Sequence, residues 1–427
     1  MNINIPLNVK IYPSKANGTV TVPSSKSLAH RAIILASLSH GESTITNFNG
    51  SSDLYATIEC MRALGASITE DNSTLKIKGI EDYTKVNSNI LDANESASTL
   101  RFIIPLLEKF NRLFVIKGKE SLFVRPMEVY ENLFKLSSSK FELDIDSCTL
   151  LVKPKLINKP IHLDGSISSQ FITGLLLYLP IRNENSKLVI ENLVSYDYFL
   201  LTIEMLKKFG ATVSYETVGT TTLVNIEGGT EYKPCTYDIE GDYSQLANFL
   251  VLGTINNDIK VKGLTFDSYQ GDKRLLNIFP NAKYEDGMYL ISKYKQENLS
   301  FDMKHNPDLG PILMAYFALT GGRIDNVNRL VYKESNRVAS MIEELKKLNV
   351  HISLVNDSVF IEKIDCIDVS DVVLDSHNDH RIFMALSLLA TISKHPIVIK
   401  NARSVRKSYP KFIEDLKSLG IKIDEEL

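Results

Sequence analysis

The pattern of apolar and polar residues repeats along the chain with a period of about 70 residues. Each copy has a helix end of the type Leu-x-x-apolar-Gly, an alternating strand, a polar turn and a second strand. Clear copies are MRALGASITEDNSTLKIKG, LKKFGATVSYETVGTTTLVNIEG and LKKLNVHISLVNDSVFIEK. Weaker copies lie near KFELDIDSCTLLVKP and NAKYEDGMYLISKY, and LKSLGIKIDEEL closes the chain without the last strand.

Six strongly apolar segments run in phase with these hairpins. They read PSSKSLAHRAIILASL, ESASTLRFIIPLL, GSISSQFITGLLLYL, EGDYSQLANFLVL, NPDLGPILMAYFAL and NDHRIFMALSLLA. An almost wholly apolar helix is buried, whereas the helix that precedes each hairpin is amphipathic. Each repeat therefore predicts the order βαβαββ, and the fold class is α/β.

Six repeats in 427 residues predict two domains of three repeats each. The pattern breaks in YKPCTYDIEGD, where we expect the chain to change domain. We place the first domain at residues 1–20 and 238–427 and the second at 21–237. The strand that precedes Lys26 could pack with either half.

Composition narrows the function classes. With 48 basic and 51 acidic residues, the net charge is −3, so no global basic field attracts nucleic acid. The four cysteines are far apart without a CxxC pair, which disfavours a zinc site or a disulfide framework. No apolar run approaches the length of a membrane span, and the N-terminal residues do not resemble a secretion signal. We therefore expect a cytoplasmic protein.

The polar starts of the apolar and amphipathic helices carry the candidate chemistry. Free N–H groups and the positive end of the helix dipole make a helix start a binding site for phosphate or carboxylate. Eight cations lie at these starts, namely Lys26, Arg31, Arg101, Arg125, Lys333, Arg337, Arg381 and Lys407. Two acids, Asp308 and Glu334, lie among them. This combination predicts anionic substrates and acid–base chemistry.

A purely structural explanation is also possible for the polar residues at each helix start. Serines, asparagines and aspartates before a helix often serve only as caps, and this applies to Ser168 and Ser195. Arg101 could form a structural salt bridge, and Arg125 could be a surface arginine before a helix that begins at Pro126. Lys333 and Arg337 have i,i+4 spacing, and an exposed charged helix end would also explain them. The His-x-x-His spacing of NDHR with the preceding histidine lacks a third ligand cluster, so we expect no metal.

These segments resemble the EPSP synthases, the 3-phosphoshikimate 1-carboxyvinyltransferases, over essentially the full chain. The segments that carry the resemblance are PSSKSLAHR, ASTLR, the arginine of VRP, DGSISSQF, KESNR, NDHR and KSYP. The resemblance implies a two-domain inverted α/β barrel that needs no cofactor. It implies transfer of the enolpyruvyl group of phosphoenolpyruvate to the 5-hydroxyl of shikimate 3-phosphate. We expect a monomer without nucleic-acid or membrane partners.

The resemblance also implies the roles of individual residues. Shikimate 3-phosphate would contact Lys26, Ser27, Arg31, Ser168, Ser169, Ser195, Tyr198, Asp308 and Lys333. Phosphoenolpyruvate would contact Lys26, Ala97, Arg125, Gln170, Arg337, Arg381 and Lys407. Asp308, Glu334 and Lys26 would be the catalytic residues.

Some positions depart from the family pattern. Ser25 replaces a usual glycine, His30 replaces a frequent asparagine, and Arg329 stands near where some members use asparagine. Glu95-Ser96-Ala97 replaces Asn-Ala-Gly, which changes the implied phosphoenolpyruvate pocket. In this family the herbicide glyphosate occupies that pocket, beside the position of Ala97.

Two other functions compete with this one. The related transferase that acts on UDP-N-acetylglucosamine typically carries a reactive cysteine before the VRP arginine, but GKESLFVRP has none. A non-catalytic protein that binds anions could use the same cations. Asp308 and Glu334 would have no purpose in such a protein.

Overall fold

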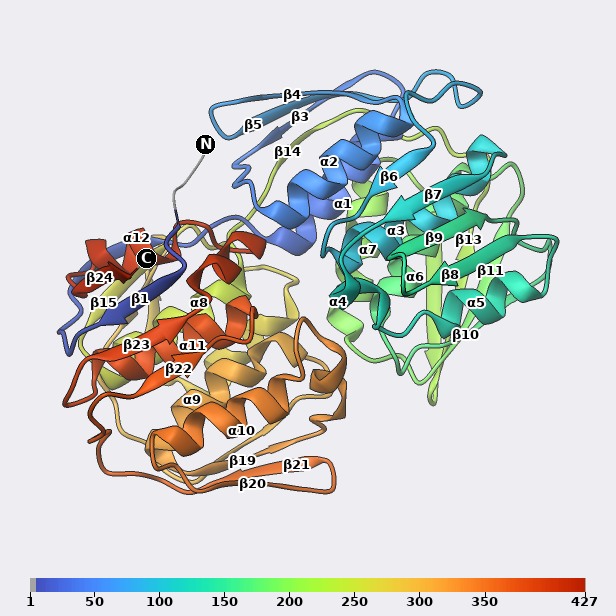
Figure 1. Cartoon of the computed structure of the whole chain (residues 1–427). Helices are drawn as coiled ribbons and strands as arrows, with labels where there is room; N and C mark the ends of the chain where they lie inside the picture. The colour runs from blue at the N-terminus through green and yellow to red at the C-terminus, as the bar shows by residue number, and fades with distance from the viewer. Residues whose placement is uncertain (1–4, 427) are drawn as a thin grey trace. The chain divides into compact units, whose positions relative to one another are not determined.

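Six four-stranded sheets carry the α/β fold in the computed structural model, which describes residues 5–426 (Figure 1). The chain divides into unit 1, Met1–Pro23 with Glu240–Leu427, and unit 2, Ser24–Ile239. The chain thus changes unit after Pro23 and again after Ile239, within three residues of the positions expected from sequence.

Unit 2 contains three of the sheets and the helices between their strands. Its strands are β3 (Glu42–Thr46), β4 (Ser67–Asp71), β5 (Thr74–Lys78), β6 (Ile90–Asp92), β7 (Phe114–Lys117), β8 (Lys140–Asp144), β9 (Thr149–Lys153), β10 (Ile161–Asp164), β11 (Ser186–Glu191), β12 (Val213–Val218), β13 (Thr221–Ile226) and β14 (Thr236–Asp238). Its α-helices are α1 (Lys26–Ser37), α2 (Ser52–Leu64), α3 (Ala97–Leu106), α4 (Glu120–Phe123), α5 (Glu128–Lys135), α6 (Ser169–Tyr178) and α7 (Tyr196–Lys208), and its 3₁₀ helices are η1 (Leu107–Phe110) and η2 (Leu179–Ile181).

Unit 1 contains the other three sheets. Its strands are β1 (Asn8–Ile11), β2 (Gly18–Thr21), β15 (Ile259–Lys262), β16 (Ala282–Glu285), β17 (Met288–Ile291), β18 (Leu299–Asp302), β19 (Gly322–Asp325), β20 (Ile352–Val355), β21 (Ser358–Ile361), β22 (Val373–Asp375), β23 (Ile397–Lys400) and β24 (Ile423–Glu426). Its α-helices are α8 (Tyr243–Ile255), α9 (Gly310–Thr320), α10 (Arg337–Lys347), α11 (His380–Thr391) and α12 (Phe412–Ser418), and its 3₁₀ helices are η3 (Gly271–Ile278), η4 (Pro307–Leu309), η5 (Asn328–Tyr332) and η6 (Ala402–Lys407).

The sheets share one strand pattern, shown by the order β6-β7-β9-β8. β6 runs parallel to β7 with Leu91 opposite Ile116, and β9 runs antiparallel to both β7 and β8. A parallel pair needs a crossover connection, which α3 supplies here, whereas the hairpin β8–β9 needs only a short turn. The βαβαββ order predicted from the sequence is therefore the repeat of the fold.

The first strands of two repeats are exchanged between the units. β2 precedes α1 of unit 2 in the chain but pairs with β15 in unit 1, with Val20 opposite Val261. β14 precedes α8 of unit 1 but pairs with β3 in unit 2, with Tyr237 opposite Ile45. The N-terminal strand β1 lies between β23 and β24 and supplies the strand that the sixth repeat lacks.

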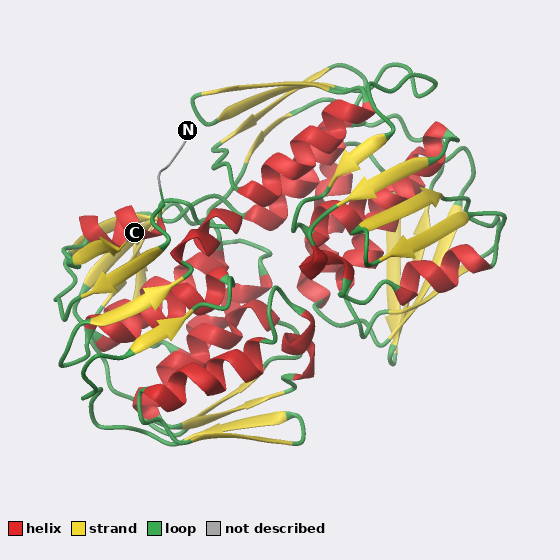
Figure 2. Ribbon diagram, in the orientation of Figure 1, coloured by secondary structure: helices red, strands yellow, loops and turns green. Residues whose placement is uncertain are grey.

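Within each unit, the helices lie at the centre and the sheets lie outside them (Figure 2). The first helix of each repeat is almost completely buried, as the apolar pattern predicted. Close packing of α3 against α6 depends on Gly174, because an added Cβ would lie 2.3 Å from the Arg101 carbonyl oxygen and 2.3 Å from the Tyr130 hydroxyl. This packing fixes the neighbouring starts of α3 and α6, which carry candidate site residues. Among residues 5–426, no helix combines the length and apolar character of a membrane span.

Candidate functional site

In unit 2, the candidate residues lie at the starts of α1, α3, α6 and α7. Lys26 is the first residue of α1, and its Nζ lies 2.8 Å from Oδ2 of Asp53 in α2. Ser27 follows it and is half-buried. Ala97 opens α3 and is 8% exposed, next to the cap in which Ser96 Oγ accepts a hydrogen bond from Thr99 N.

Arg31 is buried among α1, α6 and α7 with neutral oxygens around its guanidinium group. Its Nε donates to Thr202 Oγ1 at 2.9 Å, and Nη2 donates to Thr173 Oγ1 at 3.1 Å. Its Nη1 donates to the Ser27 carbonyl at 2.6 Å, so the expected proximity of these two residues is present. Burial lowers the pKa of Arg31 to about 10, against the raising effects of Tyr198 and Tyr237.

Arg101, Gln170 and Arg125 form a second group of polar residues. Arg101 Nη1 donates to Gln170 Oε1 at 2.8 Å, and Nη2 donates to the Pro126 carbonyl at 2.7 Å. Gln170 Nε2 in turn donates to Ser98 Oγ at 3.0 Å. The structure contradicts the salt-bridge alternative, because among residues 5–426 Arg101 has no ion-paired carboxylate.

Arg125 is a buried arginine and not a surface one. It is 7% exposed, its Nε donates to the Ser121 carbonyl, and its buried Nη2 has no partner in the described chain. Burial and the neighbouring Arg125 lower the pKa of Arg101 to about 9, against weaker effects of Tyr130 and Glu128. The expectation that Pro126 opens the next helix was wrong. That helix, α5, begins at Glu128, and the Pro126 carbonyl serves Arg101 instead.

The serines of unit 2 lie at the starts of α6 and α7, and of the three only Ser168 caps its helix with its side chain. Ser168 Oγ caps α6 by accepting a hydrogen bond from Gln170 N at 3.3 Å, so the capping role considered for Ser168 is present. Ser169 is 7% exposed. Ser195 precedes α7 with φ of 53°, and its side chain does not cap the helix. Tyr198 follows in the first turn, and its carbonyl accepts hydrogen bonds from Arg31 and Thr202.

The buried arginines of unit 2 carry positive charge that no carboxylate among residues 5–426 neutralises. Arg31, Arg101 and Arg125 are buried, and none has an ion-paired carboxylate in the part of the chain that is described. The starts of α3 and α6 add their N–H groups and dipoles. A buried charge without a partner is costly, and an anionic ligand would remove that cost.

In unit 1, by contrast, Arg337 is at the centre of a network of carboxylates. Its side chain is 1% exposed and contacts Asp379 Oδ2 at 2.8 Å, Glu334 Oε2 at 2.6 Å and Asp308 Oδ1 at 3.0 Å. These carboxylates outweigh burial and raise the pKa of Arg337. Arg337 opens α10, whereas Lys333 lies before it at the end of η5. Their i,i+4 spacing predicted that the two cations share a helix face, and this prediction was wrong because Lys333 lies outside α10. Both side chains nevertheless contact Asp308.

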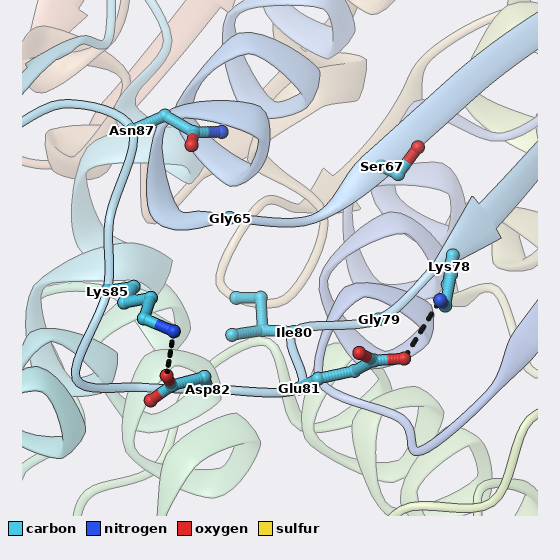
Figure 3. A pocket seen from close by; sticks show the side chains of 9 residues that line it. All are labelled: Gly65, Ser67, Lys78, Gly79, Ile80, Glu81, Asp82, Lys85 and Asn87. Carbon is cyan, nitrogen blue, oxygen red and sulfur yellow. Dashed lines mark ion pairs between the residues drawn. The ribbon is translucent and has the colours of Figure 1, made fainter.

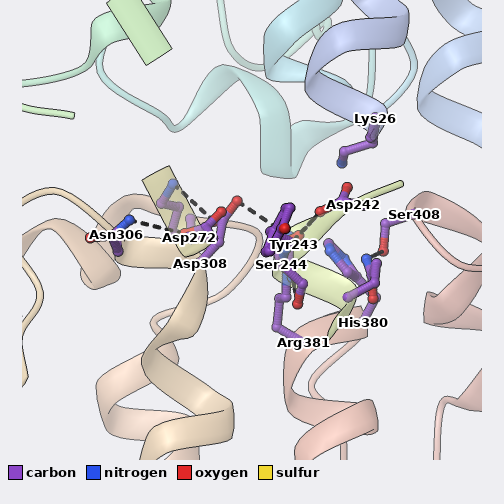
Figure 4. Close-up of polar contacts among 12 residues, drawn as sticks. Lys26, Asp242, Tyr243, Ser244, Asp272, Asn306, Asp308, His380, Arg381 and Ser408 are labelled. Carbon is purple, nitrogen blue, oxygen red and sulfur yellow. Dashed lines mark hydrogen bonds and ion pairs between the residues drawn. The ribbon is translucent and has the colours of Figure 1, made fainter. Parts of the chain in front are cut away.

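Asp308 joins three cations. Lys333 Nζ lies 3.3 Å and Arg337 Nη1 3.0 Å from Oδ1. Arg381 Nη2 lies 3.4 Å from Oδ2, and Figure 4 labels both Arg381 and Asp308. Burial raises the pKa of Asp308, but Lys333, Arg381 and Arg337 together hold it well below its ordinary value. The side chain of Asp308 is 27% exposed, so a ligand can reach this ionised carboxylate.

Arg381 and Lys407 complete the expected residues of unit 1. Arg381 is buried, and it donates from Nη2 to Ser244 Oγ at 2.9 Å and from Nη1 to the Ser244 carbonyl at 3.2 Å. Lys407 Nζ donates to the Asn378 carbonyl at 2.7 Å. Asp379 caps α11 by accepting a hydrogen bond from Arg381 N and also pairs with Arg337.

Sequence reasoning missed two buried acids in this region. Asp242 caps α8 and accepts a hydrogen bond from Ser244 N at 2.8 Å. Its place at the fourth of the six in-phase helix starts was a usable signal. Asp272 in η3 is 4% exposed and has no comparable signal, because the helical pattern of its repeat is weak.

Other polar groups lie apart from these residues. A surface cavity of about 300 Å³ in unit 2 is lined by Gly65, Ser67, Lys78, Gly79, Ile80, Glu81, Asp82, Lys85 and Asn87 (Figure 3). Its lysines pair with its acids, Lys78 with Glu81 and Lys85 with Asp82. Glu343, Glu344 and His377 are spaced to hold a metal ion, but Lys347 Nζ already lies 2.8 Å from Glu344 Oε1.

Comparisons with known proteins agree on one family. The family model of EPSP synthase (3-phosphoshikimate 1-carboxyvinyltransferase) matches residues 11–416. The 3-phosphoshikimate 1-carboxyvinyltransferase of Clostridium perfringens is 39% identical over 96% of this chain and 98% of its own. That of Clostridioides difficile is 36% identical over 98% of both chains.

Solved structures show the same fold. The EPSP synthase of Acinetobacter baumannii superposes with a TM-score of 0.77 at 22% identity, over 98% of this chain and 99% of its own. The enolpyruvyl transferase NikO of Streptomyces tendae gives 0.78 at 15% identity, over 98% of each chain.

Proposed function

Because the chain belongs to the EPSP synthase (3-phosphoshikimate 1-carboxyvinyltransferase) family, we propose that it transfers the enolpyruvyl group of phosphoenolpyruvate to the 5-hydroxyl of shikimate 3-phosphate. The observation that carries this proposal is the match of one family model to residues 11–416, which include all the candidate residues in both units. The products are 5-enolpyruvylshikimate 3-phosphate and phosphate.

The substrates are two anions, and the chain offers two kinds of cationic site to hold them. We assign shikimate 3-phosphate to Lys26, Ser27, Arg31, Ser168, Ser169, Ser195, Tyr198, Asp308 and Lys333. We assign phosphoenolpyruvate to Lys26, Ala97, Arg125, Gln170, Arg337, Arg381 and Lys407. Gln170 supports this assignment because it donates a hydrogen bond to Ser98, next to Ala97 at the start of α3. Arg125 supports it through its buried Nη2, which has no hydrogen-bond partner among the described residues.

The reaction proceeds by addition and elimination. The 5-hydroxyl oxygen attacks C2 of phosphoenolpyruvate and loses its proton to Asp308, while Glu334, which enters this step in its protonated form, gives its proton to C3 to form a methyl group. In the tetrahedral intermediate, Glu334 then takes a proton back from the methyl group, the C=C bond reforms, and phosphate leaves from C2. Lys26 and the arginines stabilise the charge that develops on the leaving phosphate.

The ion pairs of Asp308 bear on its role as a base. In the free protein, three cations hold its pKa low, which makes it a weak proton acceptor. Substrate anions compete for Lys333, Arg337 and Arg381, and each competing anion raises the proton affinity of Asp308. Asp308 therefore becomes a better base once the substrates are bound.

Location and assembly follow from the same proposal. We place the reaction in the cytoplasm, where the four free cysteines remain reduced. We further propose that the enzyme works as a monomer, because each candidate residue belongs to the one chain.

A phosphate-release assay tests the function. The purified chain is mixed with phosphoenolpyruvate and shikimate 3-phosphate, with UDP-N-acetylglucosamine as the control acceptor. With phosphoenolpyruvate present, we expect phosphate release when shikimate 3-phosphate is the acceptor and none when UDP-N-acetylglucosamine is the acceptor. Release with the control acceptor would identify the related transferase, and no release with either would leave an anion-binding protein.

A further inference from the structure

Asp272 is a buried carboxyl group next to the candidate base, and the mechanism above does not use it. Its side chain is 4% exposed, and Asn306 Nδ2 donates a hydrogen bond to its Oδ1 at 3.2 Å. Asn306 lies two residues before Asp308 in the loop that enters α9. Asp272 is therefore tied to the loop that carries Asp308 (Figure 4).

Charged groups from three neighbouring segments act on this carboxyl group. They are Asp308 of η4, Asp242 at the start of α8 and Arg381 of α11. Burial, Asp308 and Asp242 raise the pKa of Asp272 to about 7, against the lowering effects of Arg381 and the Asn306 hydrogen bond. On α8, the Tyr243 hydroxyl is bonded to Tyr289 and to the Thr265 carbonyl instead.

The charge balance of Arg381 depends on whether Asp272 is ionised. Among the described residues, the guanidinium group of Arg381 forms an ion pair with Asp308 and otherwise donates hydrogen bonds only to neutral oxygens of Ser244. Its buried Nε has no hydrogen-bond partner among the described residues. Asp308 and Asp242 act on Arg381 more strongly than Asp272 does. With Asp272 protonated, these two carboxylates act on Arg381, whereas an ionised Asp272 adds a third negative charge that competes with a ligand anion.

We propose that Asp272 is a positioning residue that acts through Arg381 and Asp308. Neutral Asp272 leaves Arg381 to the phosphoenolpyruvate anion and holds, through Asn306, the loop of Asp308. Ionised Asp272 competes with that anion and weakens its binding. The inference rests on the proposed function, since it concerns how that site holds phosphoenolpyruvate.

The test compares the pH dependence of KM for phosphoenolpyruvate in the wild type and in Asp272→Asn. Asparagine keeps the size of aspartate and still accepts the hydrogen bond from Asn306, but it cannot ionise. We expect the ratio of the wild-type KM to the variant KM to be about 1 at pH 6 and to rise to about 10 at pH 9, a tenfold change that corresponds to about 1.4 kcal/mol. Ionisation of phosphoenolpyruvate itself affects both proteins equally and cancels in the ratio.

Two further variants separate charge from structure. Asp272→Ala also removes the anchor of Asn306, so we expect a lower kcat at every pH in addition to the altered pH dependence of KM. Asp286→Asn is the matched control, because it removes one carboxylate from the exposed β16–β17 turn of the same unit. The ratio of the wild-type KM to the Asp286→Asn KM should stay near 1 from pH 6 to pH 9. A rise in this ratio like that expected for Asp272→Asn would overturn the inference.

A second measurement does not depend on turnover. In protein labelled with ¹³C at the aspartate carboxyl carbons, one NMR signal should titrate near pH 7, vanish in Asp272→Asn and shift in Asn306→Ala. Should Asp272→Asn fail to fold, the wild-type titration with the Asn306→Ala assignment decides the question.

The results of these experiments separate a failure of the proposed function from a failure of the proposed role of Asp272. Absence of phosphate release at every pH would overturn the proposed function. Normal phosphate release with a KM ratio that is constant from pH 6 to 9, or a carboxyl signal that titrates only below pH 5, would overturn the role of Asp272 and leave the function standing.

Discussion

The two units place arginines at equivalent helix starts but surround them differently. In unit 2, Arg31, Arg101 and Arg125 contact carbonyl, hydroxyl and amide groups. In unit 1, Arg337 contacts three carboxylates, and Arg381 contacts Asp308. The same repeat thus supports one site with excess positive charge and one in which charges are internally paired.

The difference separates binding from acid–base chemistry. An arginine without a carboxylate gains most when an anion arrives, because the ligand supplies the missing partner. An arginine among carboxylates controls their proton affinities, and it yields to a substrate anion only at the expense of its own ion pairs. We therefore expect variants of unit 2 to affect ligand binding and variants of unit 1 to affect turnover, stability or both.

The largest expected effect concerns the acid–base role of unit 1. Glu334→Gln should lower kcat by about 10²- to 10⁴-fold, because the amide cannot deliver a proton to C3. Substrate binding should change little, and steady-state kinetics with both substrates measure the two effects. Glu343→Gln on α10, the helix that follows Glu334 in the chain, is the control, because Glu343 is 59% exposed and pairs only with Lys347 and His377 among the described residues. Near-normal kcat in Glu334→Gln would remove Glu334 from the mechanism.

The contrast between paired and unpaired arginines predicts a large loss of stability for one variant and a small change for the other. Arg337→Met leaves three carboxylates without their buried partner and should lower the free energy of unfolding by about 3–5 kcal/mol. Arg125→Met removes an uncompensated charge and should change that free energy by less than about 1 kcal/mol. Urea denaturation of the two ligand-free variants measures both values.

Ligand binding provides the counterpart to that stability measurement. Shikimate 3-phosphate with phosphoenolpyruvate should raise the Tm of the wild type by more than that of Arg125→Met, since stabilisation of the folded state grows with the logarithm of ligand affinity. Equal destabilisation of the two arginine variants would show that the units do not differ in the way proposed.

Lys407 tests whether an internally bonded cation of unit 1 still binds substrate. Lys407→Met should raise KM for phosphoenolpyruvate about 10- to 150-fold, from a loss of about 1.5–3 kcal/mol, and affect KM for shikimate 3-phosphate much less. Arg406→Met, at the exposed neighbouring position, serves as the control. Equal increases for both substrates would place Lys407 on the wrong ligand.

Ala97 in unit 2 gives the smallest of these effects. A methyl group at the start of α3 shortens the pocket that glyphosate occupies in the family, and overpacking by one methyl group costs about 1–3 kcal/mol. Ala97→Gly should therefore strengthen glyphosate inhibition by roughly 5- to 150-fold, measured against varied phosphoenolpyruvate. An inhibition constant that is already low micromolar in the parent and unchanged in the glycine variant would contradict the steric argument.

The repeat could be predicted from sequence because it depends on local patterns. Even the weak segments KFELDIDSCTLLVKP and NAKYEDGMYLISKY form hairpins, β8–β9 and β16–β17. The bounds expected from sequence already put most of β2 in unit 1 and most of β14 in unit 2. The sheets in which these strands pair could not be predicted, because a short strand fits either sheet and pairing partners are set by tertiary packing. The fourth repeat also has the 3₁₀ helix η3 in place of an amphipathic α-helix.

The positions of the candidate residues were easier to predict than their surroundings. Cations at helix starts are visible in the sequence, but their partners come from distant segments. Thr202 reaches Arg31 from α7, and Asp379 reaches Arg337 from α11. Asp272 could not be found, because its importance comes entirely from burial beside Asp308 and Asp242.

The place of β1 has a consequence for how the protein is made. β1 leaves the ribosome before either of its neighbours, β23 and β24. Unit 2 has all of its strands once residue 238 has emerged, whereas the sheet that contains β1 must wait until residue 426 has emerged. During that interval, β1 exposes unpaired backbone groups and the apolar side chains of Val9 and Ile11, so it is a segment of the nascent chain that a chaperone would protect from aggregation.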